Sequence, residues 1–226
     1  MFTPSLWIFM LVTLGLAALL TWPMIARERT KAWQTSAISS LRGIGFAMFE
    51  FETAYGSFPD SVTAPLVTAR SKSHLDLSGN AANDYFRQLL AANVITYETV
   101  FHAVTAFSKK PDNRFDSTET ALAPGEVGFG DLMNGKSALA SKGNPARPLA
   151  CAPLAYDGKT VSDRRFDPSM YDGKAVILRI DNSVTSLFID PGTGSLRLKQ
   201  GRDLLETGPE SVWGDDVTPV IVPPLP

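Results

Sequence analysis

Cysteine and histidine are scarce in this chain. Cys151 is the only cysteine, so an internal disulfide is excluded, and its apolar, strand-like surroundings contain no histidine. A buried, inert thiol is therefore favoured over a nucleophile. The only histidines, His74 and His102, flank different expected elements and have no cysteine or second histidine at metal-ligand spacing. We therefore expect no cofactor and no enzymatic activity, and we assign no catalytic or cofactor-binding residue.

An excess of positive charge is also missing. The 226 residues contain 21 lysines and arginines against 23 aspartates and glutamates, which gives a net charge of -2. Nucleic acid is therefore excluded as an expected partner. Two glycine pairs, at 128 and 130 and at 192 and 194, do not open a helix with phosphate-binding spacing, so we interpret them as turn glycines.

Acidic side chains give the remaining candidates for a site. Six aspartates in expected loops could supply oxygen ligands to calcium: Asp60, Asp112, Asp116, Asp190, Asp215 and Asp216. No run has the spacing of an EF-hand, which favours solvated carboxylates and leaves the question of a metal site open. Glu50 and Glu52 are expected on the solvent face of a helix, with a paired role across a subunit interface as the alternative.

Charge is absent from one long stretch near the N-terminus. Between Ser5 and Ala26 no residue is charged and apolar side chains cover every face, which predicts a membrane-spanning helix. Pro23 would kink this helix without ending it, because apolar residues follow.

Three basic residues come after the stretch and none before it, so the positive-inside rule alone would keep the rest of the chain in the cytoplasm. An uncleaved anchor is favoured over a cleaved signal peptide. The stretch has no basic region before it and no clean small-x-small cleavage site after it.

The pattern of a helix continues beyond the span. Apolar residues recur at three- and four-residue steps at Ile38, Leu41, Ile44, Met48, Phe51 and Tyr55. This stripe predicts one helix of about 75 Å that continues from the membrane into a folded domain. Gly56 follows the stripe and Pro59 comes three residues later, which is the usual order at a helix end.

The middle of the chain is less regular. Ser61 to Ala82 is polar and small, and is expected to form a long surface loop. Asn83 or Asp84 is expected to cap a short helix over Tyr85 to Ala92. Thr96 to Phe107 has β-branched and aromatic residues, but it also keeps helical spacing, so strand and helix both stay open.

Turns dominate from Ser108 to Pro148. Within this stretch, Val127 to Leu132 is expected to form a short strand. Pro148 to Leu154 is a second candidate, and Pro153 within it favours an edge strand.

Strands are clearest near the C-terminus. Ala175 to Ile180, Val184 to Ile189 and Ser195 to Leu198 are separated by turn-forming residues, which predicts a three-stranded antiparallel meander. The proline-rich tail, Val217 to Pro226, is expected to be an extended arm.

The expected fold class is α+β, with the long N-terminal helix packed on a C-terminal antiparallel sheet. We divide the chain into an anchor at 1–26, a globular domain at 27–216 and a tail at 217–226. Within the domain we expect the amphipathic helix at 27–55, a loop-rich insert with a short helix at 56–148, and the meander at 149–200.

This order of parts resembles type IV pilins and the pseudopilins of type II secretion systems, in particular a poorly characterised group of large pilin-like proteins. The resemblance rests on the helix end Tyr55-Gly56-Ser57-Phe58-Pro59 and on three short strings: Asn83 to Leu89, Lys110 to Asn113, and Asp172 to Arg179. One departure concerns processing. A prepilin has a basic leader, a glycine before the cleavage site and a glutamate at the fifth mature position, whereas nothing before Ser5 is basic and the apolar run contains no glutamate.

The resemblance implies a single-pass protein of the bacterial inner membrane whose globular domain lies in the periplasm. Its expected partners are the lipid bilayer and other pilin-like subunits, or further copies of itself, in protein transport or pilus assembly. A domain that binds a cell-surface or secreted partner through the loops at 108–148 is the alternative, and an anchored envelope enzyme or small-ligand binder is a weaker one.

Overall fold

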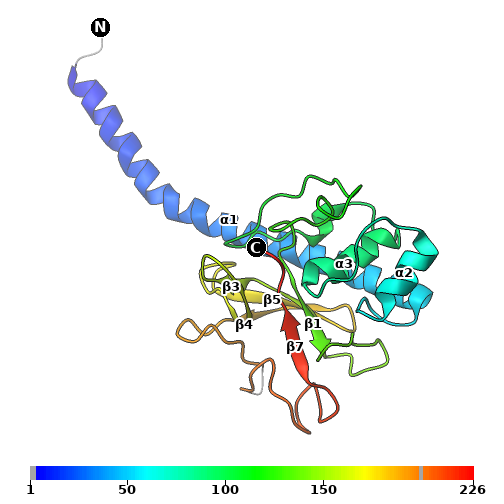
Figure 1. The fold of residues 1–226 in the computed structure, drawn as a ribbon. Coiled ribbons are helices and arrows are strands. Elements are labelled where there is room, and N and C mark those ends of the chain that lie inside the picture. The colour runs from blue at the N-terminus through cyan, green and yellow to red at the C-terminus, as the bar shows by residue number, and fades with distance from the viewer. Residues whose placement is uncertain (1–3, 199–200) are drawn as a thin grey trace.

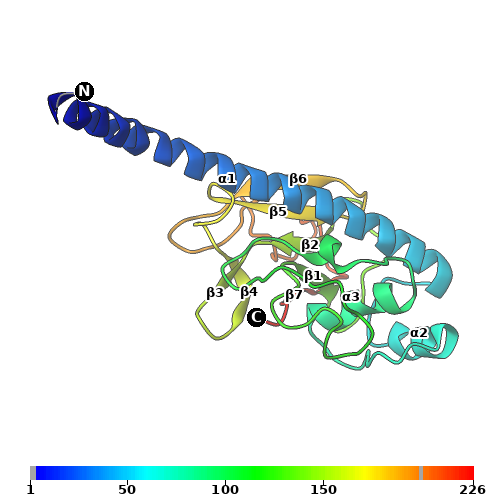
Figure 2. The same cartoon turned by 90° about the horizontal axis from the view of Figure 1, so that it is seen from above.

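The computed structural model describes residues 4–198 and 201–226, and its dominant element is the helix α1, Pro4–Tyr55 (Figure 1). This helix has 52 residues, or about 78 Å at 1.5 Å per residue. Its C-terminal half lies across the sheet, while its N-terminal half extends away from the rest of the chain (Figure 2). Pro23 does not end the helix, as predicted.

The predicted stripe on α1 is the face that packs on the domain. Leu41, Ile44, Met48 and Phe51 are buried, and the flanking stripe residues are partly buried against the same core. The helix ends at Tyr55, as predicted. Gly56 follows with a φ of +88°, in the left-handed region that glycine tolerates, and its N–H donates to the carbonyl of Glu52.

The membrane-spanning assignment concerns the projecting half of α1. In the part of the chain whose side chains are described, no helix meets the length and apolarity required to cross a membrane. Most side chains of the predicted span, Ser5 to Ala26, lie outside the described part of the structure.

One antiparallel sheet of five strands supports α1, in the order β6-β5-β2-β1-β7. Its strands are β1 (Gly130–Asn134), β2 (Pro148–Ala152), β5 (Lys174–Arg179), β6 (Val184–Phe188) and β7 (Pro219–Val222). A separate hairpin pairs β3 (Leu154–Tyr156) with β4 (Val161–Phe166). The pairing of β5 with β6 confirms two strands of the predicted meander.

Two strand predictions were wrong. Pro148 to Leu154 was expected at an edge, but β2 lies between β5 and β1, because Pro153 follows the last paired residue and leaves the ladder intact. Ser195 to Leu198 forms no strand of the sheet, and only isolated bridges, from Leu196 to Ile189 and from Arg197 to Asp203, involve it. The predicted strand at Val127 to Leu132 is present but begins later, at Gly130.

The proline-rich tail is extended, as predicted, and it also contributes β7 to the edge of the sheet. Four of its residues pair with β1. Beyond β7, the carbonyl of Pro223 accepts the N–H of Ala82, and the N–H of Leu225 donates to Asn83 Oδ1. The tail therefore connects the sheet to α3 (Ala82–Ala91).

Helices flank the end of α1. The expected loop at Ser61 to Ala82 contains α2 (Thr63–Ser71), so this prediction was wrong. The helix begins there because Asp60 Oδ1 accepts the N–H groups of Val62 and Thr63.

The short helix α3 confirms the helix predicted over Tyr85 to Ala92, but not its cap. The N-cap is Ala81, whose N–H donates to Asp84 Oδ2, while Asn83 lies inside the helix and is buried. The stretch from Thr96 to Phe107 contains only the 3₁₀ helix η1 (Glu98–Phe101), which packs on α1.

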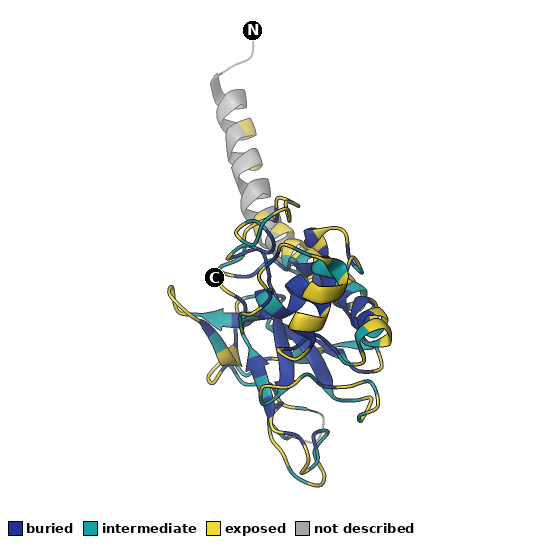
Figure 3. Cartoon of the chain, turned by 45° about the vertical axis from the view of Figure 1, so that its right-hand side comes forward, coloured by how far each residue is buried: buried dark blue, intermediate teal, exposed yellow. Residues whose placement is uncertain are grey.

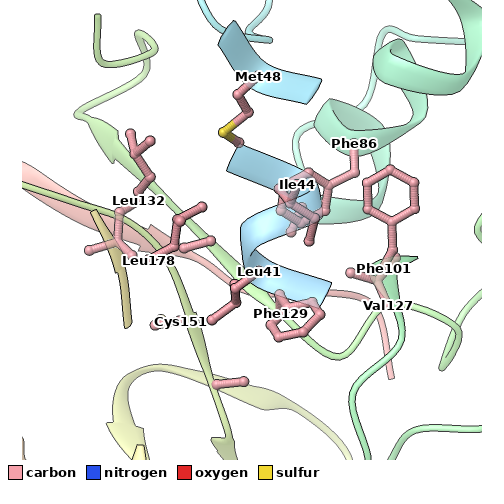
Figure 4. Close-up of a cluster of buried hydrophobic side chains, with 14 of the residues drawn as sticks. Leu41, Ile44, Met48, Phe86, Phe101, Val127, Phe129, Leu132, Cys151 and Leu178 are labelled. Carbon is pink, nitrogen blue, oxygen red and sulfur yellow. The ribbon is translucent and has the colours of Figure 1, made fainter. Parts of the chain in front are cut away.

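A single apolar core lies between α1, the sheet, α3 and η1 (Figures 3 and 4). Side chains from all four parts meet in Figure 4, among them Leu41, Phe86, Phe101 and Leu178. Gly45 allows α1 to approach the sheet, since a Cβ at this position would clash with Asn182. Close packing of the helix therefore depends on the missing side chain.

Candidate functional site

The first candidate is the surface of α1 that the domain leaves uncovered. Trp22 is 74% exposed, Ile25 55% and Phe46 69%. Phe46 lies within the docked half of the helix, whose packing face is taken by Ile44 and Met48, so its ring points away from the core. Large exposed apolar residues along one helix are typical of a surface that contacts another molecule.

The second candidate is a group of three carboxylates, which we call the acidic cluster: Glu98, Asp112 and Glu126. One oxygen from each lies within 4.8 Å of the others. Glu98 and Glu126 are buried and Asp112 is exposed, so the cluster opens to solvent on one side.

Backbone contacts hold the acidic cluster together. The N–H of Glu98 donates to Asn113 Oδ1 at 2.9 Å, which brings Asp112 to the start of η1. Asn113 has a φ of +57°, a left-handed conformation that asparagine tolerates better than most residues. The N–H of Lys109 donates to the carbonyl of Gly125 at 2.8 Å, which places the chain before Asp112 beside Glu126.

Electrostatics in the acidic cluster oppose ionisation of Glu98. Burial raises the pKa of the Glu98 carboxyl, and the neighbouring Glu126 and Asp112 raise it further. The N–H of Leu122, which donates to Glu98 Oε1, acts in the other direction. The cluster therefore holds negative charge at an energetic cost.

Among the six aspartates proposed as calcium ligands, only Asp112 joins the acidic cluster. Asp60 is buried and starts α2, and its Oδ2 also accepts the N–H of Ala138. Asp190 accepts two N–H groups of its own turn, at Gly192 and Thr193.

The other three aspartates are exposed. Asp116 accepts a hydrogen bond from the Thr120 hydroxyl, and Asp216 pairs with Arg147 at 2.8 Å. Asp215 lies beside Asp216 at the surface and is not part of the cluster.

The two helix glutamates differ from each other. Glu50 is exposed, as predicted. Glu52 is half-buried and its Oε1 accepts the N–H of Ser141 at 3.0 Å, so its expected place on the solvent face was wrong. The cause is the chain near residue 141, which lies against this side of α1.

The two histidines and the cysteine lie in different parts of the fold. His74 is exposed, whereas His102 is half-buried, and burial, together with the nearby Lys110, lowers the pKa of its imidazole. Cys151 is fully buried in β2, and burial raises the pKa of its thiol far above the usual value. The described geometry thus places neither histidine with the cysteine.

Only the second of the two glycine pairs lies in a turn, because Gly130 begins β1 and Gly128 precedes it outside any turn. A Cβ on Gly128 would come within 2.5 Å of the backbone carbonyl oxygen of Ala103, so this glycine allows two segments to touch. Gly194 has a φ of +70° in the turn after β6.

Sequence reasoning missed Glu98 and Glu126. They are 28 positions apart, and neither belongs to a spaced ligand motif. The available signal was an acidic residue next to apolar neighbours: Glu98 precedes Val100 and Phe101, and Glu126 precedes Val127. A carboxylate in such a context is usually buried with a partner.

A polar hollow lies between the β3–β4 hairpin and the turn at 191–194. Its lining includes Asp157, Asp163 and Arg165, and neither histidine nor the cysteine contributes to it.

Comparison with known proteins identifies no relative: no protein-family model, no curated protein and no solved structure matches the chain.

Proposed function

We propose that the protein is a membrane-anchored, non-enzymatic component of a pilin-like or pseudopilin-like assembly, of the type II secretion or type IV pilus kind. The observation that carries the proposal is the division of α1 into a half that packs on the sheet and a half that extends beyond it (Figure 1). The extended half coincides with the uncharged run from Ser5 to Ala26, whose length suits a bilayer.

Aromatic and basic side chains at the membrane-proximal end of the domain support an anchor. Arg29 lies 5.4 Å from the ring of Trp33, and Lys174 lies 5.1 Å from the ring of Phe188. The two pairs belong to the same end, because Gln34 Nε2 donates to Ser186 Oγ and so places β6 alongside α1 there. Aromatic rings with basic partners are typical of the region where a span leaves the bilayer.

Phe46 supports a contact with another subunit. Its ring is 69% exposed although it belongs to the docked half of α1. Full burial of such a side chain against a neighbouring helix contributes about 1.5 to 3 kcal/mol. A neighbour whose helix packs beside α1 would supply that burial.

Site-specific photo-crosslinking in native membranes tests the proposal. A photoreactive residue at the exposed position Ser39 lies on α1, seven residues before Phe46. We expect crosslinks to a second copy of the chain or to pilin-like partners, and we expect Phe46→Asp to weaken them. Val62→Asp is the matched control, since Val62 is 67% exposed but lies outside α1.

Two results would contradict an assembly role. One is a chain that yields no protein crosslink from position 39 while it remains in the membrane fraction. The other is an equal loss of crosslinking in Phe46→Asp and Val62→Asp, because that loss would not come from the surface of α1.

The alternative, a domain that binds a cell-surface or secreted partner, is favoured by a different observation. Tyr97 is 53% exposed and Phe115 36%, on the irregular segment around the acidic cluster. If that alternative holds, a photoreactive residue at Phe115 should crosslink to a protein that is not pilin-like, and Phe46→Asp should leave that product unchanged.

A further inference from the structure

The acidic cluster gathers more negative charge than its described neighbours offset. Glu98 has no exposed surface and Glu126 is only 4% exposed. Among the described residues, Lys109 is the one cation within ion-pair distance, and its Nζ lies 4.0 Å from Glu126 Oε1. The Lys109 side chain is 57% exposed, so its attraction to the cluster is screened by water.

Each carboxylate uses one oxygen in a backbone hydrogen bond. Glu98 Oε1 accepts the N–H of Leu122 at 2.7 Å, and Glu126 Oε2 accepts the N–H of Ala123 at 2.9 Å. Asp112 Oδ1 accepts the N–H of Arg114 at 2.9 Å. These bonds fix the orientation of all three groups.

The second oxygen of Glu98 is left without a partner. Oε2 is fully buried and accepts no hydrogen bond from any described group. An unpaired buried carboxylate oxygen is costly, so a native structure usually supplies a proton, a water or a cation. The carboxylates of Asp112 and Glu126 cannot supply a donor while they are ionised.

We propose that the acidic cluster is a calcium site, in which Glu98, Asp112 and Glu126 each contribute one carboxylate oxygen. Water entering from the exposed side at Asp112 completes the coordination. The site lies within the domain and is independent of the assembly role proposed above.

The spacing of the oxygens fits calcium, which tolerates irregular coordination completed by water. Two ligands of one Ca²⁺ ion, each at about 2.3 to 2.6 Å, can be up to about 5 Å apart. The three oxygens lie within 4.8 Å of one another. An all-oxygen set without imidazole or thiolate also disfavours zinc.

Calcium would join three segments that are distant in sequence. Glu98 begins η1, Asp112 lies in the irregular segment that follows, and Glu126 precedes β1. Because η1 packs on α1, an ion here would fix this irregular segment against the long helix. The bound state should therefore unfold at a higher temperature than the calcium-free state.

Calorimetric titration of the whole chain in detergent micelles, with CaCl₂ after EGTA treatment, tests the site. We expect saturable binding of one Ca²⁺ ion and a higher melting temperature by circular dichroism. Asp112→Asn should weaken binding by about tenfold or more, because affinity follows the charge of the ligand set. Since Asp112 is exposed, this variant should still fold.

Glu98→Gln gives a second, independent readout. It removes the buried charge, so without calcium its melting temperature should equal or exceed that of the parent chain, while the response to calcium should disappear. Asp116→Asn is the matched control, since Asp116 is an exposed aspartate of the same segment outside the cluster, and it should bind calcium as the parent does.

Three outcomes would overturn the proposal. The first is the absence of both saturable heat and a melting shift at millimolar CaCl₂. The second is stabilisation by MgCl₂ but not by CaCl₂. The third is an equal effect of Asp112→Asn and Asp116→Asn, which would indicate diffuse attraction to acidic residues.

Discussion

Gly43 and Val100 lie so close together that a Cβ on Gly43 would be 2.9 Å from Val100 Cγ2. The contact joins α1 to η1, two elements that are far apart in sequence. A helix normally loses stability when glycine replaces alanine in its interior. At this position the destabilising effect of glycine is offset by the close packing of α1 against η1.

Gly43→Leu should therefore destabilise the domain, because the new side chain has to displace Val100. Overpacking of this kind costs about 1 to 3 kcal/mol. Ser39→Leu, four residues earlier on an exposed position of the same helix, is the control and should leave the free energy of unfolding nearly unchanged. Denaturant titration followed by circular dichroism measures the free energy of unfolding of both variants. Equal stabilities of Gly43→Leu and Ser39→Leu would show that α1 and η1 do not pack as described.

The docked face of α1 can be tested with adjacent residues. Phe51 is fully buried and its ring stacks on Tyr55 with centroids 4.6 Å apart. Phe51→Asp would bury a charge among apolar groups and should cost about 3 kcal/mol or more. Glu50→Gln, at the exposed neighbouring position, should cost little. Similar losses for the two variants in thermal or denaturant unfolding would argue against the docked helix.

Asp131 makes stability depend on pH. This residue of β1 is 5% exposed, and burial raises the pKa of its carboxyl well above the usual value. The folded chain therefore keeps a proton that the unfolded chain releases above about pH 4, so the contribution of Asp131 to stability is complete below that pH and falls as the pH rises.

Asp131→Asn should remove this dependence. The free energy of unfolding of the parent, minus that of the variant, should decrease between about pH 4 and pH 7. Taking the difference cancels the titration of other groups, including His102. Denaturant unfolding at several pH values gives the comparison, and a difference that stays constant would mean that Asp131 ionises normally in the fold.

Arg147 anchors the loop before β7. Its Nε donates to the carbonyl of Val212 at 3.1 Å and its Nη2 to that of Trp213 at 2.7 Å. Arg147→Met leaves both carbonyls without this donor, which should cost about 2 kcal/mol or more. Its Asp216 partner is 71% exposed, so Asp216→Asn should cost under about 1 kcal/mol.

Limited proteolysis separates these two changes. Cleavage within residues 205–216 should accelerate in Arg147→Met and stay near the parent rate in Asp216→Asn. Equal protection in both variants would show that the carbonyl contacts do not hold this loop.

Local signals in the sequence were sufficient for α1. Its apolar stripe repeats with the helical period, and Gly56 marks its end, so both its face and its boundary could be predicted. The pairing of β5 with β6 was also predictable from a local signal, because a short turn between two apolar segments specifies a hairpin.

Features that depend on distant partners were not predictable. The helix α2 was missed because the polar residues at its end and beyond it, from Ser71 to Asn80, made the whole stretch look like a loop, although Asp60 and Thr63 carry a capping signal. The central position of β2 depends on β1 and β5, which its own residues do not specify. The acidic cluster likewise joins Glu98 and Glu126 only through the folded backbone.

Pairing of β7 with β1 has a consequence for the order of folding. The partner of the first strand of the sheet is the last strand in the sequence, so one edge cannot form until residues 219–222 have been synthesised. Contacts between such distant segments slow folding, because loop closure must precede them. During translation the emerging chain therefore exposes β1 as an unpaired edge, and early interception by a chaperone would protect it from aggregation.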